Sequence, residues 1–159
     1  MDYNGQVEVI ARGILVQAGH VLLCRNRKWG HSYLPGGHVE FDEAASAALA
    51  RELMEEAGLP VRVGEPVLAG ECAFDQAGRR RHEVDVVFRM ALASGTPEGG
   101  NAPAAVRSLE SKLAFDWVPI EKLGTVNFKP EWMLGPVAEL ARRPELTGVR
   151  WVSAFDAGA

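Results

Sequence analysis

Residues 37–59 read GHVEFDEAASAALARELMEEAGL, and the rest of the chain is best understood outward from this stretch. Its run of alanine, leucine and glutamate predicts a helix over residues 42–57, because these residues have high helix propensity. Asp42 is expected to be the N-cap. Glu43 is expected in the first turn, where negative charge complements the helix dipole. Gly58 is expected to end the helix in the left-handed conformation.

The predicted helix has an apolar side and an adjoining acidic side. Leu49 and Leu53 recur at the i, i+4 spacing that aligns residues on one face, and Glu52, Glu55 and Glu56 fall together beside them. Like charges at these spacings oppose helix formation by roughly 0.2–0.5 kcal/mol per pair. A bound cation would remove that penalty. For three glutamates alone, a solvated acidic helix end is the competing interpretation.

Nine positions in this window follow the spacing Gly-x5-Glu-x7-Arg-Glu-apolar-x-Glu-Glu-x-Gly-apolar. They are Gly37, Glu43, Arg51, Glu52, Leu53, Glu55, Glu56, Gly58 and Leu59. The pattern resembles the signature of the Nudix hydrolases, and looser similarity extends through residues 34–37 and 115–120. This resemblance implies an α/β fold, the Nudix α/β/α sandwich with a mixed β-sheet between helices. It also implies Mg²⁺-dependent hydrolysis of a diphosphate bond in a nucleoside diphosphate derivative, by a metal-activated water.

Oxygen ligands for a divalent cation are plentiful in this window. Mg²⁺ prefers carboxylate oxygens, so Glu52, Glu55 and Glu56 are the expected metal ligands, with Mn²⁺ as a substitute ion. The resemblance adds the backbone carbonyl of Gly36 as a ligand. It also implies a further carboxylate from outside the window, for which Glu110 and Glu83 are the two candidates.

The expected catalytic residues are Arg51 and the three glutamates Glu52, Glu55 and Glu56. Glu52 is expected either to accept the proton of the attacking water or to act purely as a metal ligand. Arg51 is expected to orient a neighbouring carboxylate, with an exposed helix arginine as the alternative. Glu43 is expected to be structural.

Substrate contacts are expected on both sides of the glycine turn. Arg25, Arg27 and Lys28 precede it and have the charge to hold phosphate oxygens, although a polar loop is the competing and favoured interpretation. Gly37 lacks a Cβ and so allows phosphate to approach the backbone closely. Asn127 follows the last predicted strand of the sheet and is a candidate for contact with a base edge.

Composition limits the classes of function. At 159 residues, 47% of them hydrophobic, the chain is expected to form a single domain over residues 1–159. A net charge of −4 disfavours long nucleic acid as a partner and favours a small nucleotide substrate. A homodimer is compatible with the sequence. A catalytically silent Nudix-fold sensor that binds a nucleotide is the alternative function, which the intact glutamate set disfavours.

The number and spacing of the cysteines and histidines indicate a reducing compartment and disfavour a zinc site. Cys24 and Cys72 are expected to be buried free thiols, and a reducing cytoplasm is the expected location. The four histidines show no ligand spacing, which disfavours a zinc site. No stretch approaches 18 uninterrupted apolar residues, so no membrane span is expected.

The remaining secondary structure follows from alternation, apolar runs and turn residues. A second helix is expected over residues 130–142, a turn at residues 35–37, and a long loop over residues 93–108. Strands are expected over residues 7–17, 21–24, 61–74, 82–92, 113–118 and 149–155.

Overall fold

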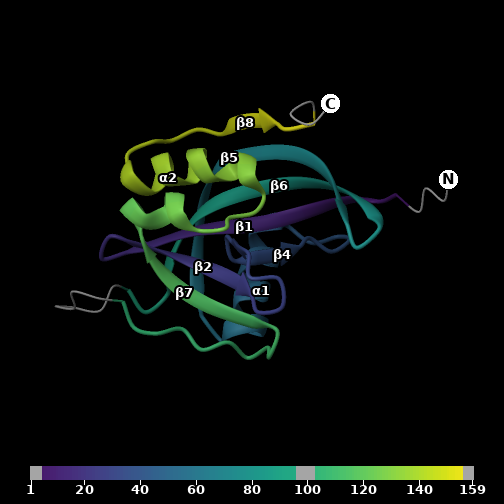
Figure 1. The fold of residues 1–159 in the computed structure, drawn as a ribbon. Helices are drawn as coiled ribbons and strands as arrows, with labels where there is room; N and C mark the ends of the chain where they lie inside the picture. Colours follow the sequence, from purple (N-terminus) through teal and green to yellow (C-terminus); the bar gives the residue numbers. More distant parts are fainter. Residues whose placement is uncertain (1–4, 96–102, 156–159) are drawn as a thin grey trace.

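The computed structural model describes residues 5–95 and 103–155 (Figure 1). An eight-stranded mixed sheet lies between two helices, α1 (Ala45–Ala57) and α2 (Leu134–Arg142). The short 3₁₀ segments are η1 (Ile120–Thr125) and η2 (Glu131–Met133). The strands are β1 (Val7–Gln17), β2 (His20–Asn26), β3 (Ser32–Tyr33), β4 (Gly36–His38), β5 (Val61–Gln76), β6 (Arg79–Leu92), β7 (Leu113–Pro119) and β8 (Arg150–Ser153).

Strand β1 is the organising element of the sheet. The strand order is β3-β2-β1-β6-β5-β8, with β4 paired to β1 and β7 paired to β2. The β1·β6 and β5·β8 pairs are parallel and the others antiparallel. β1 pairs with β4 through residues 10–12 but with β2 only through residues 16–17. The sheet therefore divides along β1.

Alternation along the strands explains why both faces of the sheet carry a helix. On β2, Val21 and Leu23 pack in the cluster that contains α2, whereas Leu22 and Cys24 pack in the cluster that contains α1. The same division separates Val87 from Phe88 on β6. Successive side chains of a strand point to opposite faces, so a strand that is apolar at every position must be covered on both sides.

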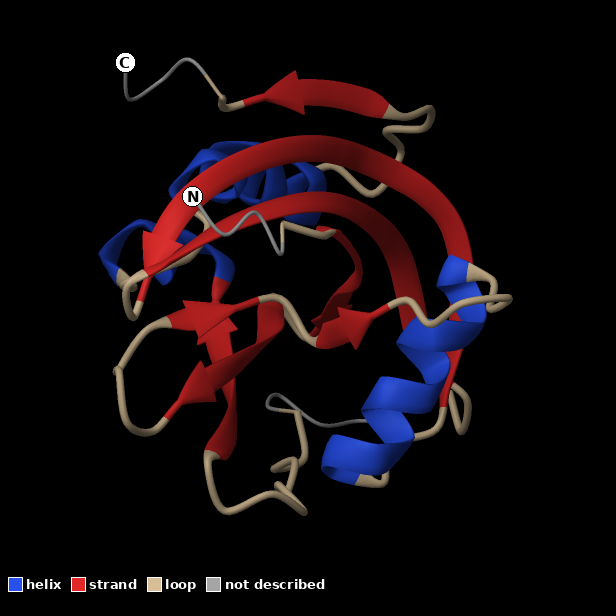
Figure 2. Cartoon of the chain, turned by 90° about the vertical axis from the view of Figure 1, so that its right-hand side faces the viewer, coloured by secondary structure: helices blue, strands red, loops and turns tan. Residues whose placement is uncertain are grey.

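The two longest strands, β5 and β6, curve around this core as a pair of arcs (Figure 2). Their antiparallel register shifts between Val63 and Pro66 and again between Pro66 and Leu68. Bulges of this kind bend a strand and increase its twist. The β5–β6 hairpin extends past the start of β1, since Val7 of β1 pairs with His82 of β6.

The sequence predicts most elements correctly and misjudges two boundaries near the glycine turn. Residues 35–37 are expected to be a turn, but Gly36–His38 form β4, because they pair with residues 10–12 of β1. The first helix begins at Ala45 rather than at residue 42, with Ala44 as an N-cap that makes no side-chain cap bond. The predicted cap is wrong: Asp42 lies in a left-handed turn with φ 62°.

Other differences are smaller. Residues 130–142 begin as the 3₁₀ segment η2 and become α-helical only at Leu134. The last strand is limited to Arg150–Ser153. Residues 96–102 of the predicted long loop lie outside the described residues. No helix in the described parts of the chain is both long and apolar enough to cross a bilayer.

Candidate active site

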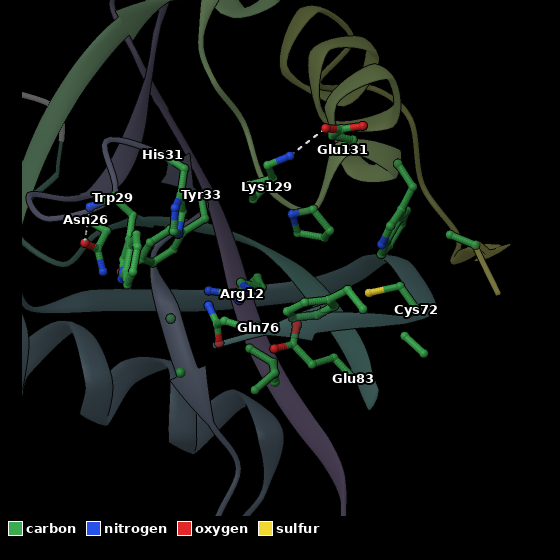
Figure 3. A pocket seen from close by; sticks show the side chains of 18 of the residues that line it. Arg12, Asn26, Trp29, His31, Tyr33, Cys72, Gln76, Glu83, Lys129 and Glu131 are labelled. Carbon is green, nitrogen blue, oxygen red and sulfur yellow. Dashed lines mark hydrogen bonds and ion pairs between the residues drawn. The ribbon is translucent and has the colours of Figure 1, made fainter. Parts of the chain in front are cut away.

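A cavity of about 1220 Å³ opens beside the point where the sheet divides (Figure 3). Residues from β1, β2, β3, β4, α1, β5 and β6 line it, together with the segments before α2 and after β8. Gly36, Gly37, Glu52 and Glu56 form part of this lining. Two residues of the acidic helix face and the glycine strand therefore border one solvent-accessible space.

Glu56 is the most perturbed carboxyl group of this face. One of its oxygens, Oε2, is buried and has no hydrogen-bond partner. Burial, together with the charges of Glu52 and Glu110, raises the pKa of Glu56 to about 7. A carboxylate with an unsatisfied buried oxygen and like-charged neighbours is stabilised by any cation that reaches it.

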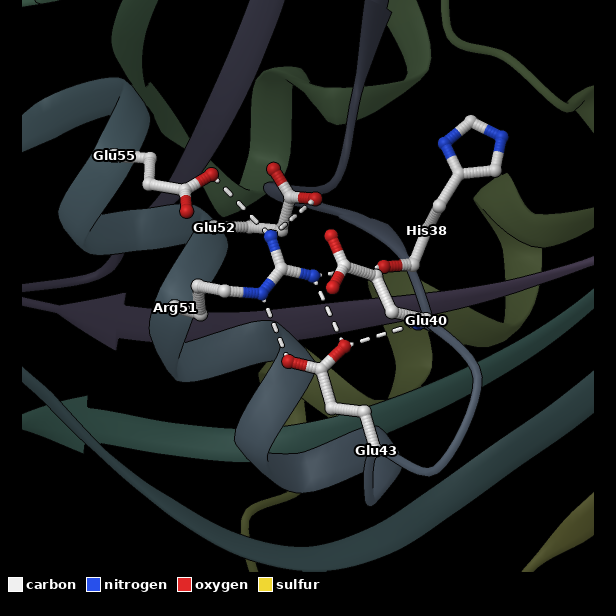
Figure 4. Close-up of polar contacts among 6 residues, drawn as sticks. All are labelled: His38, Glu40, Glu43, Arg51, Glu52 and Glu55. Atoms are coloured by element: carbon white, nitrogen blue, oxygen red, sulfur yellow. Dashed lines mark hydrogen bonds and ion pairs between the residues drawn. The ribbon is translucent and has the colours of Figure 1, made fainter.

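Arg51 binds three of the acidic groups at once (Figure 4). Its guanidinium donates to both carboxylate oxygens of Glu43 at 2.8 and 3.0 Å, to Glu52 at 3.1 Å and to Glu55 at 3.3 Å. It also donates to the backbone carbonyl of His38 at 3.1 Å. The hydrogen bond from Arg51, with that from the Glu40 amide, lowers the pKa of Glu43 to about 2.

Glu43 thus has a different structural role from the one expected. It lies before α1, whose first turn contains no acidic residue. Its carboxylate accepts from the backbone amide of Glu40 at 3.0 Å and from Arg51. Glu43 therefore fixes the loop between β4 and α1 against the helix, while Arg51 also contacts Glu52 and Glu55 of the acidic face.

Neighbouring protein atoms leave no room for a Cβ at Gly36 and Gly37 unless they move. Gly36 has φ 143°, and a Cβ there would collide with the backbone carbonyl oxygen of Ala11 on β1. A Cβ on Gly37 would collide with the carboxyl group of Glu52. The two glycines therefore allow β4 to lie against β1 and α1 at once, which brings their backbone next to Glu52.

The glutamates Glu52, Glu55 and Glu56 offer suitable oxygen ligands for a divalent cation. In this structure, however, their carboxylate oxygens do not lie close enough together to form a ready-made ligand set. In the described residues, the one set of three donors within 4.8 Å of one another is Cys72, Glu83 and Asp85, and it contains none of these glutamates. Arg51 supplies positive charge to Glu52 and Glu55 instead. The unpartnered oxygen of Glu56 lacks such a charge, which a cation would provide.

The family comparison decides the identity of this arrangement. The NUDIX domain matches residues 7–140 of the chain. The chain belongs to the Nudix family. The match includes the whole acidic window and the strands β1–β7 that frame the cavity.

Two curated relatives and one solved structure illustrate the similarity. A Mycobacterium tuberculosis protein named "Putative 8-oxo-dGTP diphosphatase 2" is 28% identical over 141 residues, which cover 86% of this chain and 97% of that protein. An ADP-ribose pyrophosphatase of Methanocaldococcus jannaschii is 30% identical over 121 residues, with 72% and 70% covered. The MutT protein of Methanosarcina mazei shares the fold with a TM-score of 0.65 at 22% identity, over 92% of this chain and 100% of the other.

The two candidates for an additional carboxylate occupy different parts of this Nudix fold. Glu110 contributes to the raised pKa of Glu56, and the adjacent Leu109 amide donates to the Glu56 carbonyl at 2.7 Å. Glu83 lies on β6 in the cavity wall, where the charges that act on its pKa are those of Arg12, Asp85, Glu8 and Arg81. Glu110 therefore adjoins the Nudix glutamates, and Glu83 does not.

Three of the expected substrate contacts, Arg25, Arg27 and Lys28, are not among the residues that line the cavity. Arg25 pairs with Asp116 at 2.7 Å, Arg27 donates to the Leu113 carbonyl at 2.8 Å, and Lys28 stacks on Trp29 at 4.7 Å. None of the three cations lines the cavity, whereas Asn127 does. The cationic side chains in its wall are Arg12, Arg80 and Lys129.

Arg12 and Asp85 are the important residues that the sequence reading missed. Arg12 lines the cavity and donates to Asp85 at 3.3 Å and to the Leu34 carbonyl at 3.3 Å. Asp85 is completely buried. The available signal was a charged residue with small or apolar neighbours on both sides in each strand: Arg12 lies between Ala11 and Gly13, and Asp85 between Val84 and Val86. Buried charges in strands are rare unless they are paired or functional.

Proposed function

We propose that this chain hydrolyses a diphosphate bond in a nucleoside diphosphate derivative with the help of Mg²⁺. The observation that carries the proposal is the meeting of Gly36, Gly37, Glu52 and the unpaired Glu56 at the wall of one large cavity. Family membership and relatives named as a diphosphatase and a pyrophosphatase support the same reaction class.

The proposed metal ligands are the carbonyl of Gly36 and the carboxylates of Glu52, Glu55, Glu56 and Glu110. All five offer the oxygen atoms that Mg²⁺ prefers, and Mn²⁺ is accepted by the same donors. When bound, the ion would neutralise the diphosphate oxygens and make water a better nucleophile at neutral pH. The ligand atoms belong to three segments, which β4, α1 and the contact of Leu109 with Glu56 hold together.

Arg51 has a positioning role in this proposal. It occupies Oε1 of Glu52 and leaves Oε2 for the ion or for the proton of the attacking water. It also holds Glu55 and the carbonyl of His38, which follows the two glycines directly. Loss of Arg51 would therefore leave the acidic face charged but poorly oriented.

The substrate proposal rests on the size and lining of the cavity. At about 1220 Å³ it accommodates a nucleoside together with its phosphates and a further group. Trp29, Tyr33 and Trp132 offer flat apolar surfaces for a base, and Asn127 offers an amide for its edge. Lys129 replaces Arg25, Arg27 and Lys28 as the candidate cation for phosphate oxygens, because it lines the cavity.

A panel of nucleotides tests the proposal directly. Nucleoside triphosphates, 8-oxo-dGTP, ADP-ribose, nucleotide sugars and dinucleoside polyphosphates would be incubated with the chain in Mg²⁺, with and without a chelator. At least one is expected to be cleaved at a diphosphate bond only when the metal is present. If several bind saturably and none is cleaved in Mg²⁺ or Mn²⁺, the proposal is wrong and the chain is a nucleotide-binding sensor.

A further inference from the structure

A second group of potential ligands lies at the wall of the same cavity and contains none of the Nudix glutamates. Two of its members, Cys72 and Glu83, line the cavity, and the third, Asp85, is fully buried. Cys72 is on β5, and Glu83 and Asp85 are on the face of β6 that adjoins it. One donor atom from each of the three residues lies within 4.8 Å of the other two. Figure 3 shows Cys72 and Glu83 on the same side of the cavity, with Arg12 between them and Trp29.

Glu83 is a buried carboxyl group without a partner. It is only 9% exposed, and no hydrogen bond or ion pair reaches its side chain from the residues that the structure describes. Glu83 also lines the cavity, so its carboxyl group is accessible from that space. Buried carboxyl groups are normally paired, because an unpaired one is costly to keep away from water.

Asp85 is only half satisfied. Its Oδ1 accepts from Arg12 at 3.3 Å, but its Oδ2 is buried and has no partner. Burial raises the pKa of Cys72, of Glu83 and of Asp85, although Arg12 opposes the shift in all three groups. In all three groups, burial outweighs the stabilisation that Arg12 gives to the charged form, so a further positive charge would favour ionisation.

A divalent cation would correct this imbalance. Three ionised ligands carry three negative charges, and Arg12 with one divalent ion would supply three positive charges. A thiolate with two carboxylates is a ligand set that Zn²⁺ accepts, and the thiolate selects soft ions over Mg²⁺. We propose that Cys72, Glu83 and Asp85 bind one thiophilic divalent cation, Zn²⁺ or Cd²⁺, at a site separate from the Nudix glutamates.

This site differs from what the sequence suggests. The sequence predicts two free thiols and disfavours zinc, since neither cysteines nor histidines show a ligand spacing. The ligands come instead from two antiparallel strands, where Cys72 is the direct partner of Glu83 and Asp85 is two residues further on the same face. Binding here does not depend on the proposed hydrolase activity.

Cd²⁺ is the probe for the test, because cadmium–thiolate bonds absorb in the ultraviolet. Tag-free, reduced protein would be titrated with Cd²⁺ in a large excess of Mg²⁺. We expect one equivalent to give the thiolate absorption, and Zn²⁺ to displace it. Cys72→Ser should abolish the absorption, whereas Cys24→Ser should retain it, since Cys24 is also buried but belongs to no such ligand group.

The variant Glu83→Gln distinguishes Cd²⁺ binding by all three ligands from Cd²⁺ binding by the Cys72 thiol alone. It keeps the thiol and should weaken Cd²⁺ binding by about tenfold or more, because a ligand is lost. The proposal fails if the unaltered chain shows no absorption at one equivalent, if Cys72→Ser retains it, or if Glu83→Gln binds Cd²⁺ as tightly as the unaltered chain. Circular dichroism would confirm folding of each variant, and Glu83→Gln carries the test if Cys72→Ser does not fold.

Discussion

Glu56 is the residue on which the proposed chemistry depends most. Its carboxyl group borders the cavity, has an unpartnered oxygen and has a pKa raised to about 7. Glu56→Gln keeps the size of the side chain and removes its charge. We expect kcat to fall at least about a thousandfold with the fold intact, as measured by steady-state kinetics and circular dichroism.

The matched control for this variant is Glu65→Gln. Glu65 is an exposed glutamate on β5 that does not line the cavity, so its variant should retain normal kcat. Normal turnover by Glu56→Gln would remove Glu56 from the mechanism. Equal losses in both variants would indicate a nonspecific effect of charge.

Glu56 also makes the stability of the metal-free chain depend on pH. Its pKa is near 4.5 when unfolded and about 7 when folded, so the folded state binds the proton more tightly. Its contribution to stability is therefore full below pH 4.5 and is lost as the pH rises to about 7. We expect this loss to be about 1–2 kcal/mol after screening by solvent.

Thermal unfolding in chelator across that pH range measures this effect. Glu56→Gln cannot ionise, so its Tm should rise relative to that of the unaltered chain as the pH increases. Addition of Mg²⁺ at the upper end should reduce the difference. If the two Tm curves run parallel across this pH range, ionisation of Glu56 does not destabilise the fold, and the prediction is wrong.

At the level of single residues, the sequence reveals functional groups that recur at a regular spacing, but it does not reveal pairs of residues that meet only in the folded chain. Glu52, Glu55 and Glu56 stand out because they recur at helical spacing, and the structure places Glu52 and Glu56 at the cavity. Arg12 and Asp85 are 73 positions apart, and only the parallel pairing of β1 with β6 brings them together. No local pattern in the sequence contains that information.

Arg51 connects elements rather than single groups, since it joins α1 to the β4–α1 loop through Glu43 and the His38 carbonyl. Arg51→Met should lower kcat/KM by about tenfold or more, because Glu52 and Glu55 lose their orientation. A double-mutant cycle with Glu43→Gln should give a coupling energy of about 0.5–3 kcal/mol in thermal or chemical unfolding. Strictly additive effects would show that the contact does not connect the two elements.

The fit of β4 against α1 can be tested with one methyl group. In Gly37→Ala the new Cβ would collide with the Glu52 carboxyl group, so activity should fall about tenfold or more while most of the stability remains. Gly135→Ala is the control, because Gly135 lies in α2 with open space around it. That variant should be fully active and as stable or more stable. Equal activity of the two variants would contradict the proposed fit.

Whole elements were predictable where local signals suffice. The strand over residues 7–17 and the left-handed end of α1 at Gly58 are as expected. The start of α1 was not predicted correctly, because the Glu43 carboxylate accepts a hydrogen bond from Arg51 and Asp42 has a left-handed backbone conformation. β4 was missed for a similar reason: its three residues become a strand only through their pairing with β1. In both cases a tertiary contact outweighs the local signal.

At the scale of the molecule, the core is independent of the acidic site. Its two clusters of buried apolar residues lie on either face of the sheet and contain none of the Nudix glutamates. Removal of Mg²⁺ by chelator should therefore abolish turnover while the chain remains folded. Tm should fall by no more than a few degrees, as scanning calorimetry would show. Unfolding in chelator at room temperature would contradict this view of the core.

The cavity is the feature that sequence reasoning could not supply. It lies where β1 pairs with β4 at one end and with β2 at the other, and residues near the hairpin end of β5 and β6 form another part of its wall. Those pairings join residues far apart in the chain. The acidic window could therefore be recognised in advance, whereas the residues facing it, such as Arg12 and Lys129, could not.

The central claim is that the acidic face of α1 and the glycine strand hold a divalent cation against a diphosphate. The most direct test is a crystal structure of the chain with Mg²⁺ and a non-hydrolysable nucleoside diphosphate derivative. We predict an ion bound to the Gly36 carbonyl, Glu52 and Glu56, and in contact with the diphosphate. A bound nucleotide with no ion at these atoms, and with both carboxylates turned away from it, would contradict the claim.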